Sequence, residues 1–159
     1  MRDPNRDFLR HTVATIAYRA AKTERDAPAG FADFQAGNGA RTPLQLLAHM
    51  GDLFDWALSM ARGNWDYKQS APLKWRNEVA RLHASLEAFD VYLASDEPLG
   101  ITTQKLFQGP IADALTHVGQ IAMLRRLASV PIRGESYARA DIVAGRLGTE
   151  QPKSAFEFD

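Results

Sequence analysis

Residues 42–63 read TPLQLLAHMGDLFDWALSMARG, and this stretch carries both the start and the stop signals of a helix. Thr42 can cap the amino end, Pro43 suits the first helical position, and Gln45 completes a capping box. Gly63 is typical of the left-handed residue that follows a helix. Between these ends, one side carries an apolar stripe with an imidazole in it: Leu46, His49, Leu53, Trp56 and Met60. The stretch therefore predicts an amphipathic helix whose inward face holds a histidine.

Three further stretches show the same helical spacing of apolar residues, namely 5–23, 73–94 and 110–129. In the second of these, the apolar stripe that marks the core face consists of Trp75, Val79, Leu82, Leu86, Phe89 and Leu93. A short fifth helix is expected over residues 136–144. Four long amphipathic helices in one chain most simply make a bundle. The expected fold class is all-α, a four-helix bundle with a short additional C-terminal helix, in a single domain over residues 1–159.

The composition argues against several classes of protein. The chain has 159 residues and no cysteine, so it has no disulfide, thiolate nucleophile or thiolate metal ligand. Its Lys and Arg (19) balance its Asp and Glu (19), and a neutral chain is a poor candidate for nucleic-acid binding. The N-terminus, MRDPNRDFLRHT, lacks the apolar segment of a signal peptide, and no apolar stretch is long enough to span a membrane. A cytoplasmic protein is expected.

The direction in which each histidine points separates the candidates for chemistry. Successive residues of a helix are about 100° apart, so His11 lies opposite the apolar stripe of its helix and is expected in solvent. His83 lies at the edge of the core stripe. His49 and His117 lie on inward faces, and so does Asp113, four residues before His117. Side chains with this spacing meet on one side of a helix, which makes these three residues a candidate site.

Two interpretations of this cluster stay open. A buried, unpaired carboxylate is costly, and a divalent metal held by His49, Asp113 and His117 would remove that cost. Two imidazoles and one carboxylate would also leave coordination positions open for water or substrate. Alternatively, His49 and Asp113 hydrogen-bond across the core while a backbone carbonyl or a tyrosine satisfies His117. The cluster is then a purely structural polar network.

Two stretches resemble the DinB/YfiT-like superfamily of bacterial metal-binding helical bundles. They are residues 42–63, quoted above, and residues 109–132, GPIADALTHVGQIAMLRRLASVPI; ESYARADIVAGRLG (135–148) is also similar to that family. In such proteins, a histidine of the second helix and a His-x3-His pair of the fourth helix hold a divalent metal. The resemblance places His49 and His117 at two of these positions, and Asp113 at the first histidine of the pair. This departure keeps three ligands and favours harder metals.

The resemblance further implies a homodimer and a long crossover between the second and third helices, here residues 64–72. It implies a DinB-like, divalent-metal-dependent enzyme of the thiol-dependent transferase or hydrolase type, with zinc, nickel, manganese or iron in the bundle interior. The partner would be a small-molecule substrate such as a low-molecular-weight thiol, with no nucleic acid and no membrane. The alternative is a non-catalytic binding or stress-associated module with a structural His/Asp network. Gln120 and Asp52, each one turn from a candidate ligand, either orient the site or are ordinary polar flanks.

Overall fold

Four long helices form the body of the protein, and they begin and end close to the predicted residues. The computed structural model describes residues 3–158. The long helices are α1 (Pro4–Glu24), α2 (Pro43–Ala61), α3 (Trp75–Ala94) and α5 (Ala112–Leu127). A short 3-10 turn, Phe31–Asp33, lies between α1 and α2. The prediction of a mostly helical protein is confirmed.

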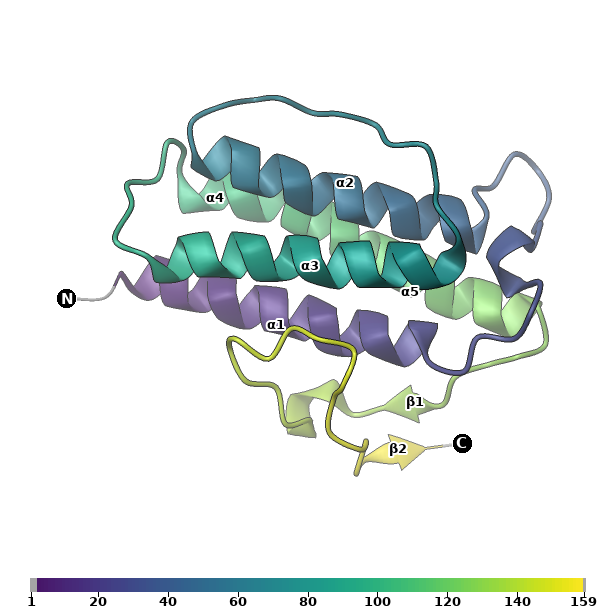
Figure 1. Cartoon of the computed structure of the whole chain (residues 1–159). Coiled ribbons are helices and arrows are strands. Elements are labelled where there is room, and N and C mark those ends of the chain that lie inside the picture. The colour runs from purple at the N-terminus through teal and green to yellow at the C-terminus, as the bar shows by residue number, and fades with distance from the viewer. Residues whose placement is uncertain (1–2, 159) are drawn as a thin grey trace.

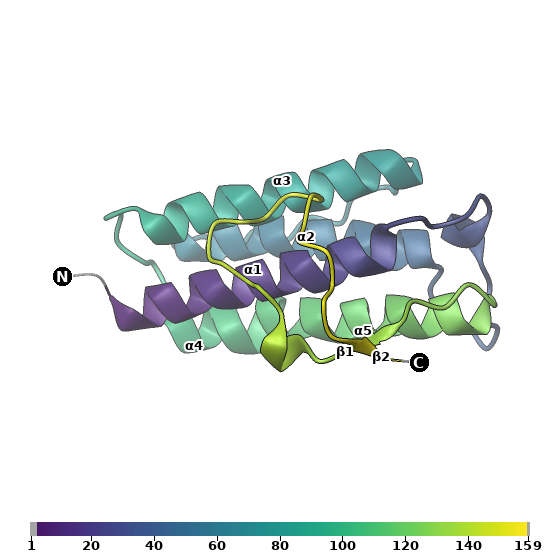
Figure 2. The ribbon, with the colours of Figure 1, turned by 90° about the horizontal axis from the view of Figure 1, so that it is seen from below.

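The four helices pack around one core in the cyclic order α1, α3, α2, α5 (Figures 1 and 2). Figure 1 shows α1 and α5 running in one direction and α2 and α3 in the other. Because α2 and α3 are parallel neighbours, residues 62–74 run back along the bundle, passing over α2 (Figure 1). α2 and α5 are antiparallel neighbours, which sets the helices that carry the candidate ligands against each other.

Specific local contacts define the ends of α2. The Thr42 hydroxyl accepts from the Gln45 backbone N–H at 3.2 Å, and the Gln45 side-chain oxygen accepts from the Thr42 N–H at 2.9 Å, so the predicted capping box is present. Gly63 follows the helix with φ of 87°. The Gly100 N–H donates to the carbonyl of Ala61 at 2.8 Å, and a Cβ on Gly100 would lie 2.3 Å from Cα of Gly63. The turn after α3 can close against α2 because Gly100 lacks a side chain, whereas Gly63 supplies the positive φ that follows the helix.

The core lies between the apolar stripes of the four helices. Phe54 of α2 and Phe89 of α3 are fully buried, and their ring centroids lie 6.1 Å apart. Other fully buried side chains are Leu9, Ile16, Leu47, Met50, Met60, Leu82, Leu86, Leu93, Leu106 and Ile111. Among residues 3–158, none of the helices combines the length and the apolar character needed to cross a membrane.

A kink precedes the helix that carries two of the candidate ligands. The sequence pattern places the start of this helix at Pro110, whereas the structure begins it with α4 (Thr103–Leu106) and continues through a π-helical turn, Phe107–Ile111, into α5. Pro110 has no N–H to donate, and Gly109 takes φ of −89° and ψ of −105°, so the helix is interrupted rather than started here. The kink lies directly before the turn of α5 that carries Asp113.

The prediction of a helix over residues 136–144 is wrong. This part of the chain has a single 3-10 turn, Tyr137–Arg139, followed by an irregular segment that passes over α1 (Figures 1 and 2). β1 (Gly134–Glu135) pairs in antiparallel fashion with β2 (Glu157–Phe158). A helix this short is marginal on its own, and contacts with the bundle decide the conformation instead.

Buried Glu135 is the centre of those contacts. It accepts hydrogen bonds from Tyr18, from Lys22 at 2.8 Å and from Ser154 at 3.1 Å. Lys22 also pairs with Glu157 of β2 at 2.8 Å. α1 thus holds both strands of the small sheet through Lys22.

Candidate metal centre

Three side chains from two antiparallel helices meet at one place in the bundle. α2 supplies His49, and α5 supplies Asp113 and His117, one helical turn apart. Nε2 of His49 lies 3.4 Å from Oδ2 of Asp113, and Nε2 of His117 lies 3.2 Å from Oδ1. One ligand atom of each residue lies within 4.8 Å of the others, a separation that a single metal ion can bridge. The structure brings together the three residues that the sequence singles out, and their role as ligands stays a prediction.

The second nitrogen of each imidazole already has a partner. Nδ1 of His117 lies 2.7 Å from Oε1 of Gln120, and Nδ1 of His49 lies 3.0 Å from the hydroxyl of Tyr67. The amide oxygen of Gln120 only accepts, so Nδ1 of His117 carries a proton, and Nε2 of His117 faces the Asp113 carboxylate. The Tyr67 hydroxyl can accept from His49 in the same way. Such partners fix the tautomer and the orientation of histidine ligands in metal sites.

Nε2 of His117 is the least satisfied atom of the cluster. It is buried and has no hydrogen-bond partner among residues 3–158. The Asp113 side chain opposite it is 46% exposed, whereas those of His49 and His117 are 19% and 11% exposed. A buried polar atom without a hydrogen bond costs free energy, and the Asp113 carboxylate, 3.2 Å away, makes none with it. A cation between them would remove this cost.

The electrostatic surroundings keep His49 in the form that binds metal. Burial lowers the pKa of His49 below its ordinary value of 6.5, and the charges of His117 and Arg41 lower the pKa further. The hydrogen bond and the negative charge of Asp113 act in the opposite direction without compensating. His49 is therefore neutral at pH 7, as a metal-binding imidazole must be.

The cluster opens into a pocket of about 600 Å³ between α2, α5 and residues 36–41. Besides the three candidate ligands, its polar lining residues are Gln120 and Arg41, and Arg41 forms no ion pair with any of residues 3–158. The remaining lining residues are aliphatic: Ala36, Ala40, Leu46, Met123, Leu124 and Leu127. A concave, mostly apolar pocket with a few convergent polar groups is typical of a site for a small organic molecule.

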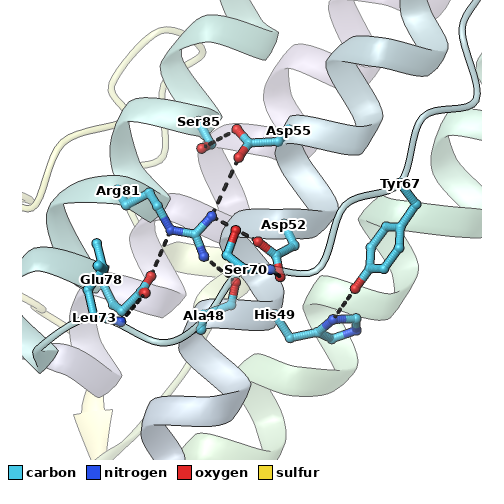
Figure 3. A network of polar contacts seen from close by, with 10 residues as sticks. All are labelled: Ala48, His49, Asp52, Asp55, Tyr67, Ser70, Leu73, Glu78, Arg81 and Ser85. Carbon is cyan, nitrogen blue, oxygen red and sulfur yellow. Dashed lines mark hydrogen bonds and ion pairs between the residues drawn. The ribbon is translucent and has the colours of Figure 1, made fainter.

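A network of charged side chains lies beside His49, between α2 and α3 (Figure 3). Arg81 of α3 donates from Nε to Glu78 at 2.8 Å, from Nη1 to Asp52 at 3.0 Å and from Nη2 to the Ala48 carbonyl at 2.6 Å. The second oxygen of Asp52 accepts from the backbone N–H of Ser70 at 3.0 Å. The second oxygen of Glu78 accepts from the N–H of Leu73 at 2.7 Å (Figure 3). The network therefore ties residues 62–74 to α2 and α3.

Gln120 and Asp52, whose roles the sequence leaves open, have different partners in the structure. Gln120 contacts the candidate ligand His117 directly. Asp52 contacts Arg81 and the Ser70 backbone instead. Tyr67, the partner of His49, was missed by sequence reasoning because it lies in a connection with no helical spacing, and no rule relates a loop position to His49.

The other two histidines lie away from this site. His11 is exposed, as predicted. His83, predicted at the edge of the core, is only 6% exposed. Its Nε2 lies 2.8 Å from Oε2 of Glu24, and its Nδ1 contacts the carbonyl of Leu147. Both partners accept, so His83 donates from both nitrogens as an imidazolium. These partners come from α1 and the C-terminal segment, which the helical pattern of α3 does not reveal.

Comparison of the chain with protein-family models, with curated proteins and with solved structures finds no match.

Proposed function

We propose that the protein binds one divalent metal ion through His49, Asp113 and His117 and acts as a metal-dependent enzyme on a small organic substrate. The observation that carries this proposal is the buried Nε2 of His117. It makes no hydrogen bond to any of residues 3–158, although it lies 3.2 Å from the Asp113 carboxylate and beside a second imidazole. A metal ion satisfies all three groups at once.

The donor set fits a divalent cation. Two neutral imidazoles and one carboxylate are the ligands of many zinc, manganese, iron and nickel sites, and three protein ligands leave coordination positions free. Asp113, the most exposed of the three, lines the pocket, so the free positions would face a bound molecule. A bound divalent cation would supply Lewis acidity, which makes a water or a thiol a better nucleophile near neutral pH.

The residues around the cluster have separate roles in this proposal. Gln120 and Tyr67 hold the two imidazoles by their Nδ1 atoms and direct each Nε2 toward the metal. Arg41, without an ion pair to any of residues 3–158, supplies a positive charge at the pocket for an anionic group of the substrate. The aliphatic wall excludes water from an apolar part of the substrate. A small molecule that has both an anionic group and an apolar part suits this lining, and a low-molecular-weight thiol is one candidate.

We propose that the protein belongs to the DinB/YfiT-like superfamily. Two features support it: the long crossover over residues 62–74, and the placement of the motif residues His49 and His117 on facing helices. The resemblance also implies a homodimer, which stays a proposal.

A purely structural polar network is the alternative. Such a network should pair its buried atoms and close off solvent. Nε2 of His117, which is buried and makes no hydrogen bond to any of residues 3–158, and the half-exposed carboxylate of Asp113 favour the metal instead.

The proposed activity is tested by a screen of thiol transfer and ester hydrolysis with three preparations: metal-loaded protein, chelated protein, and chelated protein after metal is restored. We expect turnover that is lost on chelation, regained with metal, and absent in an Asp113→Ala/His117→Ala variant. Turnover that survives in this variant contradicts the proposal.

A further inference from the structure

Residues 62–74 have no helix or strand, yet they are held at several points. The Tyr67 ring packs edge-on against Trp56 of α2, with ring centroids 5.7 Å apart. The Tyr67 hydroxyl lies 3.0 Å from Nδ1 of His49. Farther along, the N–H groups of Ser70 and Leu73 donate to side chains of α2 and α3. Long connections without regular structure are uncommon in compact domains and often have a functional role. This connection places one of its side chains on a candidate metal ligand.

The two acceptors that hold the connection depend on Arg81. Asp52 and Glu78 are 2% and 0% exposed, and each uses one oxygen for Arg81 and the other for the backbone of the connection. A buried carboxylate that loses its cation either becomes protonated or moves toward water. In either case, its hydrogen bond to the connection weakens.

We infer that Arg81 is a positioning residue for the metal centre. It fixes Asp52 and Glu78, these fix residues 70–73, and the connection then holds the Tyr67 hydroxyl on His49 (Figure 3). The inference deepens the proposed function and rests on it. Hydrogen bonds weaken steeply with small displacements, so a modest shift of the connection removes the contact with His49. Arg81 of α3 thus acts on His49 of α2 through the connection and Tyr67.

A merely stabilising role for Arg81 is the competing explanation, and the chain offers a matched control. Arg10 of α1 makes a two-pronged ion pair with Asp90 of α3, with both distances 2.9 Å and side chains 14% and 5% exposed. This pair links two helices as Arg81 does, and neither residue is on the connection. Arg10→Gln therefore reports the effect of losing a largely buried ion pair alone.

The test compares wild type, Arg81→Gln, Tyr67→Phe, the double variant and Arg10→Gln. Arg81→Lys, which keeps a positive charge between the carboxylates, replaces Arg81→Gln if the latter does not fold. Two quantities are measured: the affinity for cobalt(II) with its absorption spectrum, and the ¹⁵N chemical shift of His49 Nδ1 in metal-free protein. The second reports the hydrogen bond to Tyr67 whether or not metal binds.

Tyr67→Phe should weaken cobalt binding by about tenfold, as loss of a group that holds a ligand does. Arg81→Gln should also weaken cobalt binding, and it should shift the His49 Nδ1 resonance as Tyr67→Phe does. In the Tyr67→Phe background, Arg81→Gln should cause no further change in either quantity. Arg10→Gln should change neither quantity. If Arg81→Gln leaves the resonance at its wild-type position, the inference is wrong. If wild type binds no cobalt, the proposed function fails, and the resonance alone still decides the role of Arg81.

Discussion

The guanidinium of Arg81 lies directly over Gly51 in the middle of α2, where a Cβ would be 2.8 Å from Cζ of Arg81. A glycine inside a helix costs about 0.5–1 kcal/mol relative to alanine. This glycine gives Arg81 room to reach Asp52 and the carbonyl of Ala48. The weak helix former at this position is thus explained by a contact with another helix.

Gly51→Ala is predicted to destabilise the protein by about 1–3 kcal/mol, because the new methyl group displaces the guanidinium from its acceptors. The free energy of unfolding in urea measures this. Gly119 of α5 is the control, since a Cβ there meets no atom within 4 Å, and Gly119→Ala should stabilise by about 0.5–1 kcal/mol. In an Arg81→Gln background, Gly51→Ala should become neutral or stabilising. Equal effects at the two glycines would contradict the role assigned to Gly51.

Stability should depend on pH through His83. Burial by itself lowers the pKa of His83, but the hydrogen bond and charge of Glu24, together with the Leu147 carbonyl, outweigh it and raise the pKa above 6.5. A raised pKa in the folded state means that this stabilisation is complete below about pH 6.5 and is lost as the pH rises through the folded value. The free energy of unfolding should therefore fall on the alkaline side of pH 6.5.

Urea unfolding at a series of pH values tests this, with His83→Gln and His11→Gln compared with wild type. The decline should disappear in His83→Gln and persist in His11→Gln, because His11 is exposed. The protection factors against hydrogen exchange in the segment around Leu147 should fall over the same pH range, since His83 binds its carbonyl. A decline that persists unchanged in His83→Gln would assign the effect to another group.

Asp113→His tests the departure from the three-histidine pattern that the family resemblance implies. We expect the variant to keep zinc, since imidazole is a good zinc ligand, and to lose affinity for manganese, which prefers the carboxylate. Asp113→Ala, which removes the ligand, should lower the affinity for both metals by at least about 100-fold. Competition titrations with a chromogenic chelator measure these affinities. Retention of full affinity in Asp113→Ala would exclude Asp113 as a ligand.

The sequence predicts those parts of the fold that a single helix encodes. The capping box at Thr42, the stop at Gly63 and the apolar stripe of α2 define that helix from its own residues. The faces of α2 and α5 likewise bring His49 to Asp113 and His117, because a residue's direction on a helix follows from its spacing.

Features that depend on contacts between distant segments escape such reasoning. Tyr67 reaches His49 from an irregular connection, and Glu24 reaches His83 from another helix. Residues 136–144 have a helical pattern, but Glu135 and its partners hold the adjoining chain against α1 in a different conformation. Pro110 suggests a helix start, whereas α4 and a π-helical turn come before α5, with a kink at Gly109. The first two features are contacts between distant segments, and in the last two a tertiary contact or a local backbone adjustment overrides the local preference.

The proposed function depends on a metal ion held by His49, Asp113 and His117, so the metal content of tag-free protein is the first quantity to measure. Plasma mass spectrometry of wild type beside the Asp113→Ala/His117→Ala variant gives the number of ions per chain. We expect close to one divalent ion per chain in wild type and its loss in the variant. Wild-type protein that is purified empty and also fails to bind added zinc, nickel or manganese would contradict the proposed function, and the cluster would then be a structural network.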